Sequence, residues 1–441
     1  MTARALVVTL LALLPIAVAA QYSIGSLAPP LTIPRAEGAS PCSRTWYDPD
    51  VHVTPDGDLG LIAQSFAPTP CALGSVDMFQ GATRDRSSGG WRLPSLVGSM
   101  NECPVLQGQY ERCGFEPGLD AGPIASPSVV RLENPNSPTG VRYYMAFVGG
   151  NADFINGKIY WAVSDDAKWW TVYARNTNEY WAPVIAAKYV RSEESPRSTP
   201  ACAAPSGIGQ VQLAFEDGRF YVFFQYWHPV QPECEEGRDT PACAASPWKT
   251  YDRGLSSVLY RFDYDPKHPF GFGPSVREVY LDGGWQRHDA MLVWGYDVDV
   301  DGEHLRTEGG TPVMELYNGV QAAGFGFGAG DVKFGNGRWL HVYEFEGITR
   351  AQTAESLDPT VATWTAPERV DTTPVTQTYP LATFEIASGL WYGSLAGSPD
   401  KWWIWMPVPT EAQCGSPERP NVFGALSLLP AELCTPDRPC S

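Results

Sequence analysis

One arrangement recurs along the chain: a strand, a turn containing Gly, an aromatic-rich second strand, and a third strand that ends near a Trp. Clear examples are "GQVQLAFEDGRFYVFFQYW", which begins at Gly209, and "GDVKFGNGRWLHVYEFEG", which begins at Gly330. A small sheet of this kind cannot bury both faces alone, so repeated units must pack against one another. Abundant Gly, Pro and aromatic residues, with few helix-period runs, favour an all-β fold. The repeat therefore predicts a β-propeller.

The number of repeats sets the expected number of blades. The units begin near Tyr47, Ser126, Gly209, Gly330 and Tyr379. This count predicts a five-bladed ring, whose last blade borrows a strand from the N-terminal segment near 31–34. A six-bladed ring is the alternative if residues 288–320 form a blade of their own. A β-sandwich with long loops is disfavoured, because the pattern returns at blade-like spacing.

The beginning of the chain predicts export. A short positive end at Arg4 precedes the apolar run "ALVVTLLALLPIAVAA", followed by Gln21. This pattern is typical of a secretory signal peptide, which we place at residues 1–20. Residues 21–441 are then expected to form one secreted propeller domain. No later segment of the sequence is apolar for long enough to predict a membrane span.

The cysteines agree with an extracellular location. The chain has 10 cysteines and no CxxC pair, which favours disulfides over zinc or redox sites. Cys103 with Cys113 and Cys234 with Cys243 each bracket a polar loop, but spacing does not fix the pairing. Cys42 and the three C-terminal cysteines leave open a bridge that joins the two ends.

The charge excludes several classes of partner. With 49 acidic and 31 basic residues, the formal net charge is −18, so nucleic acids and anionic membranes are disfavoured. The 54 aromatic residues, 16 Trp, 20 Tyr and 18 Phe, suit stacking on sugar rings. Carbohydrate is the expected partner, bound by a monomer.

In a propeller, the end of the strand at which a polar residue lies decides whether it faces the central opening. The innermost strand of each blade starts beside the central opening, and its turn lies at the opposite face. Acidic residues in those turns are expected to form the turns only; they are Asp56, Asp58, Glu216 and Asp217. The residues expected at the opening to bind substrate are Asp48, Ser128, Gln210, Gln212, Trp227, His228 and Asp289.

Two quoted stretches carry a resemblance. "SPSVVR…YYMAF…KIYWAVSDDAKWW" and "GDVKFGNGRWLHVY…AESLDPTVATW" resemble blades of the five-bladed glycoside hydrolases of the arabinanase, xylosidase and invertase type. The resemblance implies a glycoside hydrolase that uses a pair of carboxyl groups flanking the scissile bond. It also implies a general base at the start of the first inner strand, where Asp50 stands, with Asp48 as the alternative.

The sequence departs from that family at two positions. The Asp expected on the second inner strand is replaced by Ser126 or Ser128, and the Glu expected on the third by Gln210 or Gln212. A hydroxyl or amide cannot protonate a leaving group. The candidates for the acid are therefore carboxyl groups elsewhere: Asp331 and Glu344 first, then Asp120 and Asp289.

One further stretch matches a cation loop. "YDVDVDGEHLRTEGG" has the D-x-D-x-D-G-x5-E spacing of a calcium loop, supplied by Asp297, Asp299, Asp301, Gly302 and Glu308. The flanks read as strands, which argues against a helix–loop–helix site. The stretch is interpreted as a β-hairpin, with structural Ca²⁺ as the alternative; no cofactor is required for catalysis.

Two other functions remain open. The missing acid favours a non-catalytic carbohydrate-binding or adhesion propeller as the alternative to an enzyme. A lyase or sialidase could use the same scaffold, but no cluster of three arginines collects at the opening to hold a carboxylate, which disfavours a sialidase.

Overall fold

The computed structural model describes the strands and their nearby turns. The described residues are 22–31, 45–67, 75–84, 91–92, 124–149, 158–173, 184–187, 207–227, 255–281, 283–288, 292–294, 329–345, 348–379, 389–395, 399–409 and 426–440. The predicted signal peptide lies outside them. Among these residues, no helix has the length and apolar character needed to cross a membrane.

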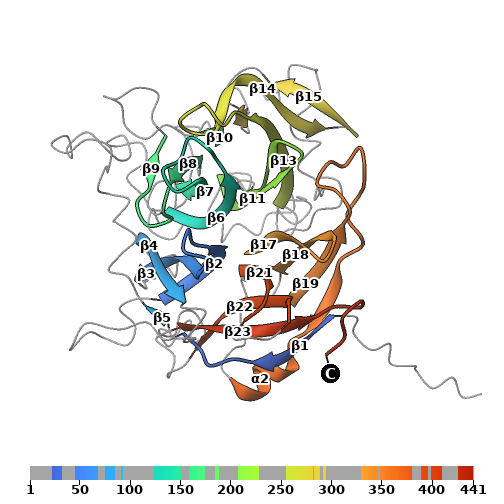
Figure 1. Ribbon diagram of the computed structural model, residues 1–441. Helices are drawn as coiled ribbons and strands as arrows, with labels where there is room; N and C mark the ends of the chain where they lie inside the picture. Colours follow the sequence, from blue (N-terminus) through green and yellow to red (C-terminus); the bar gives the residue numbers. More distant parts are fainter. Residues whose placement is uncertain are drawn as a thin grey trace, which may run out of the picture.

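Five of the described strands surround the centre of the molecule, and each contacts the next in a closed cycle (Figure 1). They are β2 (Thr45–Val53), β6 (Ile124–Glu133), β11 (Gly207–Glu216), β17 (Ala329–Gly335) and β21 (Gly389–Gly393). Each begins an antiparallel unit that runs outward from the centre. We number these units one to five in that order, and we call these five strands the inner strands.

The first three units are separate sheets. The first continues through β3 (Leu59–Ala67), β4 (Ser75–Arg84) and β5 (Trp91–Arg92). The second continues through β7 (Val141–Gly149) and β8 (Lys158–Ser164), with β9 (Thr171–Val172), β10 (Ile185–Ala187) and β16 (Leu292–Trp294) at its outer edge. The third continues through β12 (Arg219–Trp227), β13 (Leu255–Tyr264), β14 (Phe272–Leu281) and β15 (Gly284–His288).

The last two units are joined by the N-terminal strand. The fourth continues through β18 (Arg338–Phe345), β19 (Ile348–Ala354) and β20 (Glu368–Asp371), which is followed by the short helix α2 (Thr373–Thr378). The fifth continues through β22 (Lys401–Pro409) and β23 (Leu426–Cys434). Strand β1 (Tyr22–Leu27) pairs antiparallel with β23 and parallel with β20, so the two units share one sheet.

These observations confirm the predicted all-β propeller fold. The N-terminal closing strand was expected near 31–34. Among the described residues the strand that joins the last two units is Tyr22–Leu27, Leu31 makes an isolated bridge to Leu428, and residues 32–34 lie outside the described part. The number of blades stays a prediction, because most of residues 288–320 lies outside the described part of the chain.

Apolar clusters between neighbouring units hold the ring together. Trp161 of β8 packs edge-on against Phe220 of β12, with ring centroids 5.0 Å apart, so the second and third units share one core. Alternation along the strands divides neighbouring tryptophans: Trp402 enters the cluster on one face of its sheet and Trp403 the cluster on the other. Trp169 and Trp170 also differ in burial, Trp170 being buried and Trp169 exposed, but they lie in the bend between β8 and β9 and not on a strand as expected, so strand alternation does not explain the difference.

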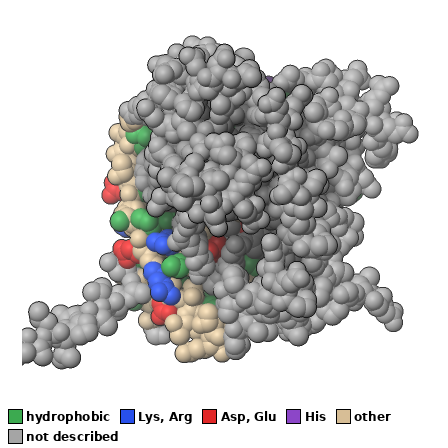
Figure 2. Space-filling model, turned by 180° about the vertical axis from the view of Figure 1, so that it is seen from behind, with side chains coloured by type: hydrophobic (Ala, Val, Ile, Leu, Met, Phe, Trp, Pro, Cys, Tyr) green, Lys and Arg blue, Asp and Glu red, His purple; other side chains and the backbone are tan. Residues whose placement is uncertain are grey.

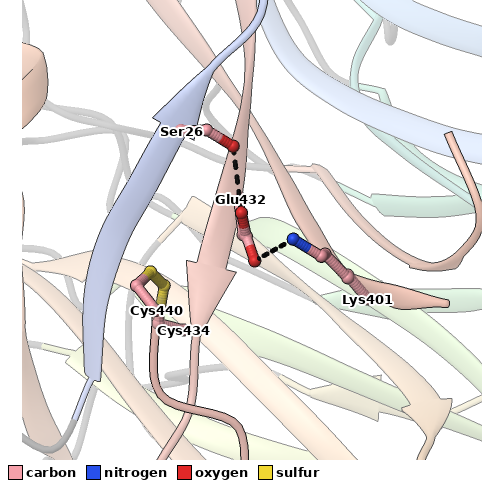
Figure 3. The surroundings of a disulfide bond; sticks show 5 residues. All are labelled: Ser26, Lys401, Glu432, Cys434 and Cys440. Carbon is pink, nitrogen blue, oxygen red and sulfur yellow. Dashed lines mark hydrogen bonds and ion pairs between the residues drawn. A yellow bond between two sulfur atoms is a disulfide. The ribbon is translucent and has the colours of Figure 1, made fainter. Parts of the chain in front are cut away.

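The two ends of the described chain meet at the fifth unit. The Ser26 hydroxyl on β1 donates to Glu432 on β23, whose carboxylate also pairs with Lys401 at 2.6 Å (Figure 3). A disulfide joins Cys434 to Cys440 beside this pair. This bridge is local to the C-terminal segment; the other cysteines lie outside the described residues.

The face opposite to that of Figure 1 carries charges of both signs. Figure 2 shows acidic and basic side chains next to one another, with hydrophobic ones between them, along the described edge of this face.

Candidate functional site

Three inner strands carry the same backbone irregularity near their N-terminal ends. The pairing register shifts between Tyr47 and Asp50 in β2, and corresponding shifts occur in β6 and β11. At each shift one non-glycine residue takes a positive φ: Asp48 at 42°, Ser126 at 48° and Gln210 at 53°. We call these three residues the bulge trio.

The side chains of the bulge trio meet although they come from three different units. The Ser126 hydroxyl donates to Asp48 Oδ2 over 2.9 Å, and Ser126 Oγ lies 3.5 Å from Gln210 Oε1. Ser126 is buried, whereas Asp48 and Gln210 are half-buried. The trio therefore places a carboxylate, a hydroxyl and an amide side by side at one end of the inner strands.

The backbone at the trio is strained. Left-handed φ values are unfavourable for residues with a Cβ, and Asp48 and Ser126 are each followed by Pro, which narrows their conformations further. Such outliers persist only where the surrounding structure enforces them, and they cluster at functional sites. Three of them in contact indicate a site, not three independent turns.

Polar side chains just beyond two of the bulges tie β2 to β6 and β6 to β11. Asp50 Oδ2 accepts a hydrogen bond from the Val129 N–H at 3.0 Å, and Ser128 Oγ accepts one from the Leu213 N–H at 2.8 Å. These contacts satisfy backbone donors that would otherwise be buried without a partner. Asp50 and Ser128 thus act as locks between units.

Asp331 makes the equivalent contact between the fourth and fifth units. Its Oδ2 accepts from the Leu390 N–H at 2.9 Å, and its Oδ1 accepts from the Val332 N–H at 2.8 Å. Burial raises the pKa of Asp331 to about 7; the ammonium of Lys333 opposes this shift and the Asp50 carboxylate adds to it.

Lys333 lies between these buried carboxylates. Its Nζ is 2.7 Å from Asp50 Oδ2, 3.4 Å from Asp331 Oδ1 and 3.1 Å from the Val129 carbonyl oxygen. Burial lowers the pKa of Lys333, but the carboxylates of Asp331 and Asp50 outweigh it, so the pKa is raised overall and the side chain stays charged. Sequence reasoning missed this residue, because a lone Lys in a strand reads as a solvated side chain.

The three predicted catalytic carboxyl groups occupy buried positions. Asp50 and Asp331 are 1% and 2% exposed and are engaged in the contacts described above. Glu344 is 6% exposed and lies on β18 opposite Ala329, the first residue of the inner strand β17. Asp50 and Asp331 therefore share one ammonium group, and Glu344 lies at the end of the fourth unit where its inner strand begins.

The predicted substrate-binding residues fall into two groups. Asp48 and Gln210 belong to the bulge trio; Ser128 is a lock, and Gln212, also buried, holds the corresponding position on β11. The remaining predicted positions lie outside the described residues or, for Trp227, have no described side chain: Trp227, His228, Asp289, Asp120 and the calcium-loop residues Asp297, Asp299, Asp301 and Glu308.

The acidic turn residues lie at the opposite ends of the strands, as expected. Asp217 takes a positive φ of 48° in the turn between β11 and β12. Glu216 does more than form a turn: its carboxylate accepts hydrogen bonds from Trp339 Nε1, the Ser356 hydroxyl and the Leu357 N–H. It therefore locks the third unit to the fourth at the end distant from the trio.

Within the described residues, one group of side chains has metal-ligand spacing, and it is not a metal site. Glu432, Cys434 and Cys440 lie close together, but the two sulfurs are bonded to each other. A thiolate is the form of Cys that ligates a metal, so this group offers only one carboxylate.

The chain is thus a β-propeller with a polar site at the start of its inner strands. No family model and no curated protein matches its sequence. Solved structures with a similar fold include a family 117 glycoside hydrolase of Zobellia galactanivorans, with a TM-score of 0.47, 9% identity, and coverage of 94% of this chain and 90% of that one.

Two further solved structures have a comparably low TM-score and sequence identity. One is a family 43 β-xylosidase/α-arabinofuranosidase from a compost metagenome (TM-score 0.43, 13% identity, coverage 90% and 94%). The other is a family 62 α-L-arabinofuranosidase catalytic domain of Coprinopsis cinerea (TM-score 0.43, 11% identity, coverage 96% and 100%). At such low sequence identity, the activity of this chain must be argued from its own residues.

Proposed function

We propose that this protein is an exported glycoside hydrolase that acts on a polysaccharide or oligosaccharide at the bulge trio. The observation that carries the proposal is the convergence of Asp48, Ser126 and Gln210 from three separate units, each in a strained left-handed conformation. Carbohydrate recognition needs carboxylate, hydroxyl and amide groups that pair with sugar hydroxyls, and the trio supplies all three.

Asp48 is the residue best suited to activate water. It is half-buried, and the donated hydrogen bond from Ser126 stabilises its carboxylate form, which a general base requires. The contacts favour Asp48 over Asp50, since the Asp50 carboxylate is 1% exposed and already holds Lys333 and the Val129 N–H.

The acid must come from outside the trio, which contains one carboxyl group. Asp331 is disfavoured because each of its oxygens accepts a backbone hydrogen bond and the side chain is buried. Glu344 is the remaining candidate among the three predicted catalytic residues, and its place opposite Ala329 puts it at the inner-strand end of the fourth unit. We assign it the role of general acid within this proposal.

A non-catalytic carbohydrate-binding protein is the second candidate. The specific observation that favours it is the neutrality of Ser126 and Gln210, the two members of the bulge trio other than Asp48. Paired-carboxylate hydrolysis requires two carboxyl groups about the glycosidic bond, whereas binding needs only matched donors and acceptors.

A substrate panel separates the two functions. The protein is incubated with arabinan, fructan and xylan, and new reducing ends and binding are measured in parallel. New reducing ends that disappear in Asp48→Asn support the hydrolase; binding without new reducing ends supports the alternative. Asp217→Asn is the matched control, because it makes the same replacement at a left-handed position at the far end of the strands.

Structural Ca²⁺ at residues 297–308 is proposed separately. It is supported by the oxygen ligands and their spacing in the sequence. A melting temperature that stays unchanged when calcium is titrated into EDTA-stripped protein would remove this proposal.

A further inference from the structure

Lys333 connects units that are not neighbours in the ring. It belongs to β17 of the fourth unit, whose neighbouring inner strands are β11 and β21. Its ammonium nevertheless reaches the Asp50 carboxylate on β2 at 2.7 Å and the Val129 carbonyl on β6 at 3.1 Å. The side chain therefore crosses the centre of the propeller to the first and second units.

The two groups that Lys333 holds lie just beyond two of the strained bulges. Asp50 follows Asp48 by two positions, and Val129 follows Ser126 by three. Asp50 and Val129 are also bonded to each other through the Val129 N–H. Lys333, Asp50 and Val129 thus form a closed set of contacts that fixes the β2 and β6 backbones relative to each other.

This set of contacts can hold the strained backbone of the β2 and β6 bulges in place. Asp48 and Ser126 have side chains, precede Pro and yet keep positive φ values, so their backbone must be held by its surroundings. The hydrogen bond between their side chains depends on the same alignment of β2 and β6. A polar contact that spans the ring is well placed to enforce it.

We propose that Lys333 is a positioning residue for the site: it holds Asp50 and Val129 so that the β2 and β6 bulges present Asp48 and Ser126 to each other. In this role it acts through the strands that carry Asp48 and Ser126. The importance of this arrangement for catalysis rests on the proposed function, whereas the arrangement itself does not.

The charged groups around Lys333 explain why an ammonium is required. Asp50 faces it from β2 and Asp331 from its own strand, and the Nδ1 of His52 lies 3.9 Å from Asp50 Oδ1. Without the ammonium, the Asp50 and Asp331 carboxylates would face each other in a buried space, which disfavours having both ionised. An apolar side chain of similar length would fill the volume without restoring the contacts.

Crystal structures of two variants test the proposal without any substrate. Lys333→Met removes the ammonium at nearly constant length, and Lys333→Arg restores a cation. Lys401→Met is the matched control, since it breaks the 2.6 Å pair with Glu432 at the fifth unit. We expect the Ser126–Asp48 hydrogen bond to be lost in Lys333→Met and kept in Lys333→Arg and Lys401→Met. A Lys333→Met structure with both bulges and this hydrogen bond intact would overturn the proposal.

Hydrogen exchange at the Val129 amide gives a second reading. Exchange should be about tenfold faster in Lys333→Met than in the parent protein and unchanged in Lys401→Met, because the amide loses its aligned acceptor. If Lys333→Met does not fold, Lys333→Gln replaces it: the amide can still donate to the Val129 carbonyl but carries no charge. Protection of Val129 equal to that of the parent protein in Lys333→Gln contradicts the proposal.

Steady-state kinetics test the functional part of the proposal once a glycoside that the protein cleaves has been found. Misplacement of Asp48 should lower kcat by about 100-fold with little change in KM, because a shift of about 1 Å can cost that much in chemistry. Rescue by Lys333→Arg is expected. A Lys333→Met protein that is less stable but keeps the parent kcat, KM and pH profile would show a role in stability alone. If the parent protein cleaves no glycoside, the proposed function fails while the crystallographic and exchange results still decide the role of Lys333.

Discussion

The Ser126 hydroxyl and the Asp48 carboxylate are hydrogen-bonded over 2.9 Å although they are 78 positions apart in the chain. The contact exists because the inner strands of two consecutive units lie side by side, each with a left-handed residue at the same place. A repeated backbone irregularity, and not a local sequence motif, therefore creates the polar site of this propeller.

Asp48→Asn and Asp50→Asn should have different effects. Asp48→Asn removes the proposed base and should lower kcat by about 10²–10⁴-fold with little change in stability. Asp50→Asn breaks the pair with Lys333 and should cost about 3 kcal/mol in the free energy of unfolding. Substrate turnover and urea denaturation of both variants check this. Equal loss of turnover in stable forms of both proteins would contradict the assignment of Asp48.

Two serines on β6 should likewise differ. Ser128→Ala leaves the buried Leu213 N–H without its acceptor and should cost about 1–3 kcal/mol in unfolding free energy. Ser126→Ala removes the donor to Asp48 and should lower kcat/KM about tenfold, equal to about 1.4 kcal/mol, while leaving the fold intact. Denaturation midpoints and kinetics measured on both proteins give the comparison; a destabilised Ser126→Ala with normal kinetics would reverse the two roles.

The fold could be predicted from sequence because its signal is repeated. The rhythm of strand, turn and aromatic strand recurs in each unit, and each recurrence reports the same packing requirement. The alternation that separates Trp402 from Trp403 on β22 follows directly from strand geometry. The position of the closing strand was less accurate, because the single strand at Tyr22–Leu27, which lies between β20 and β23, has no repeat to support it.

The site was predicted only in part for a physical reason. The short stretch "YDPD" contains two candidate bases, and a strand of regular alternation gives no basis for separating residues two apart. The bulge supplies that basis, since it brings Asp48 to the trio while Asp50 turns to Val129 and Lys333. Positive φ at an Asp or Ser before Pro is not encoded by local preference; it arises from contacts between distant strands.

Glu216 offers a test of the locks at the far end of the strands. Glu216→Gln keeps one acceptor oxygen but turns an NH₂ group toward donors, so the bonds from Trp339, Ser356 and Leu357 cannot all persist. We expect a loss of about 2 kcal/mol in unfolding free energy, measured by urea denaturation, with unchanged turnover. Asp56→Asn, at an exposed turn, is the control and should have no measurable effect.

The raised pKa of Asp331 predicts a pH dependence of stability. Burial is its main cause, and the folded-state pKa of about 7 exceeds the ordinary value of 3.8. The folded protein therefore holds this proton more tightly between these two values, so the contribution of Asp331 to stability falls as pH rises through that window and is level above it. Asp358, Asp371 and Asp437 have lowered pKa values and contribute the opposite trend near the acid end.

A difference measurement isolates the Asp331 contribution. Urea denaturation of the parent protein and of Asp331→Asn is compared at several pH values from about 4.5 to about 8. The parent protein should lose stability relative to the variant as pH rises toward about 7. A difference that does not vary with pH would mean that Asp331 titrates normally, in spite of its burial and its hydrogen bonds from Val332 and Leu390.

Gln210→Glu asks whether one added carboxyl group improves the site. Asp48 Oδ2 and Gln210 Oε1 lie 2.9 Å and 3.5 Å from the same Ser126 Oγ, so they are at most about 6.4 Å apart, close to the separations used by paired-carboxylate glycosidases. The charge on Asp48 would favour the protonated form of a new Glu, which could then serve as a general acid. With Glu344 already supplying the acid, as proposed, we expect kcat/KM on an unactivated oligosaccharide to show no gain in Gln210→Glu over Gln210→Met, which is of similar length but cannot donate a proton. A rise of about 100-fold in Gln210→Glu alone would contradict the assignment of Glu344, because it would show that the acid was missing and that the leaving group departs beside residue 210.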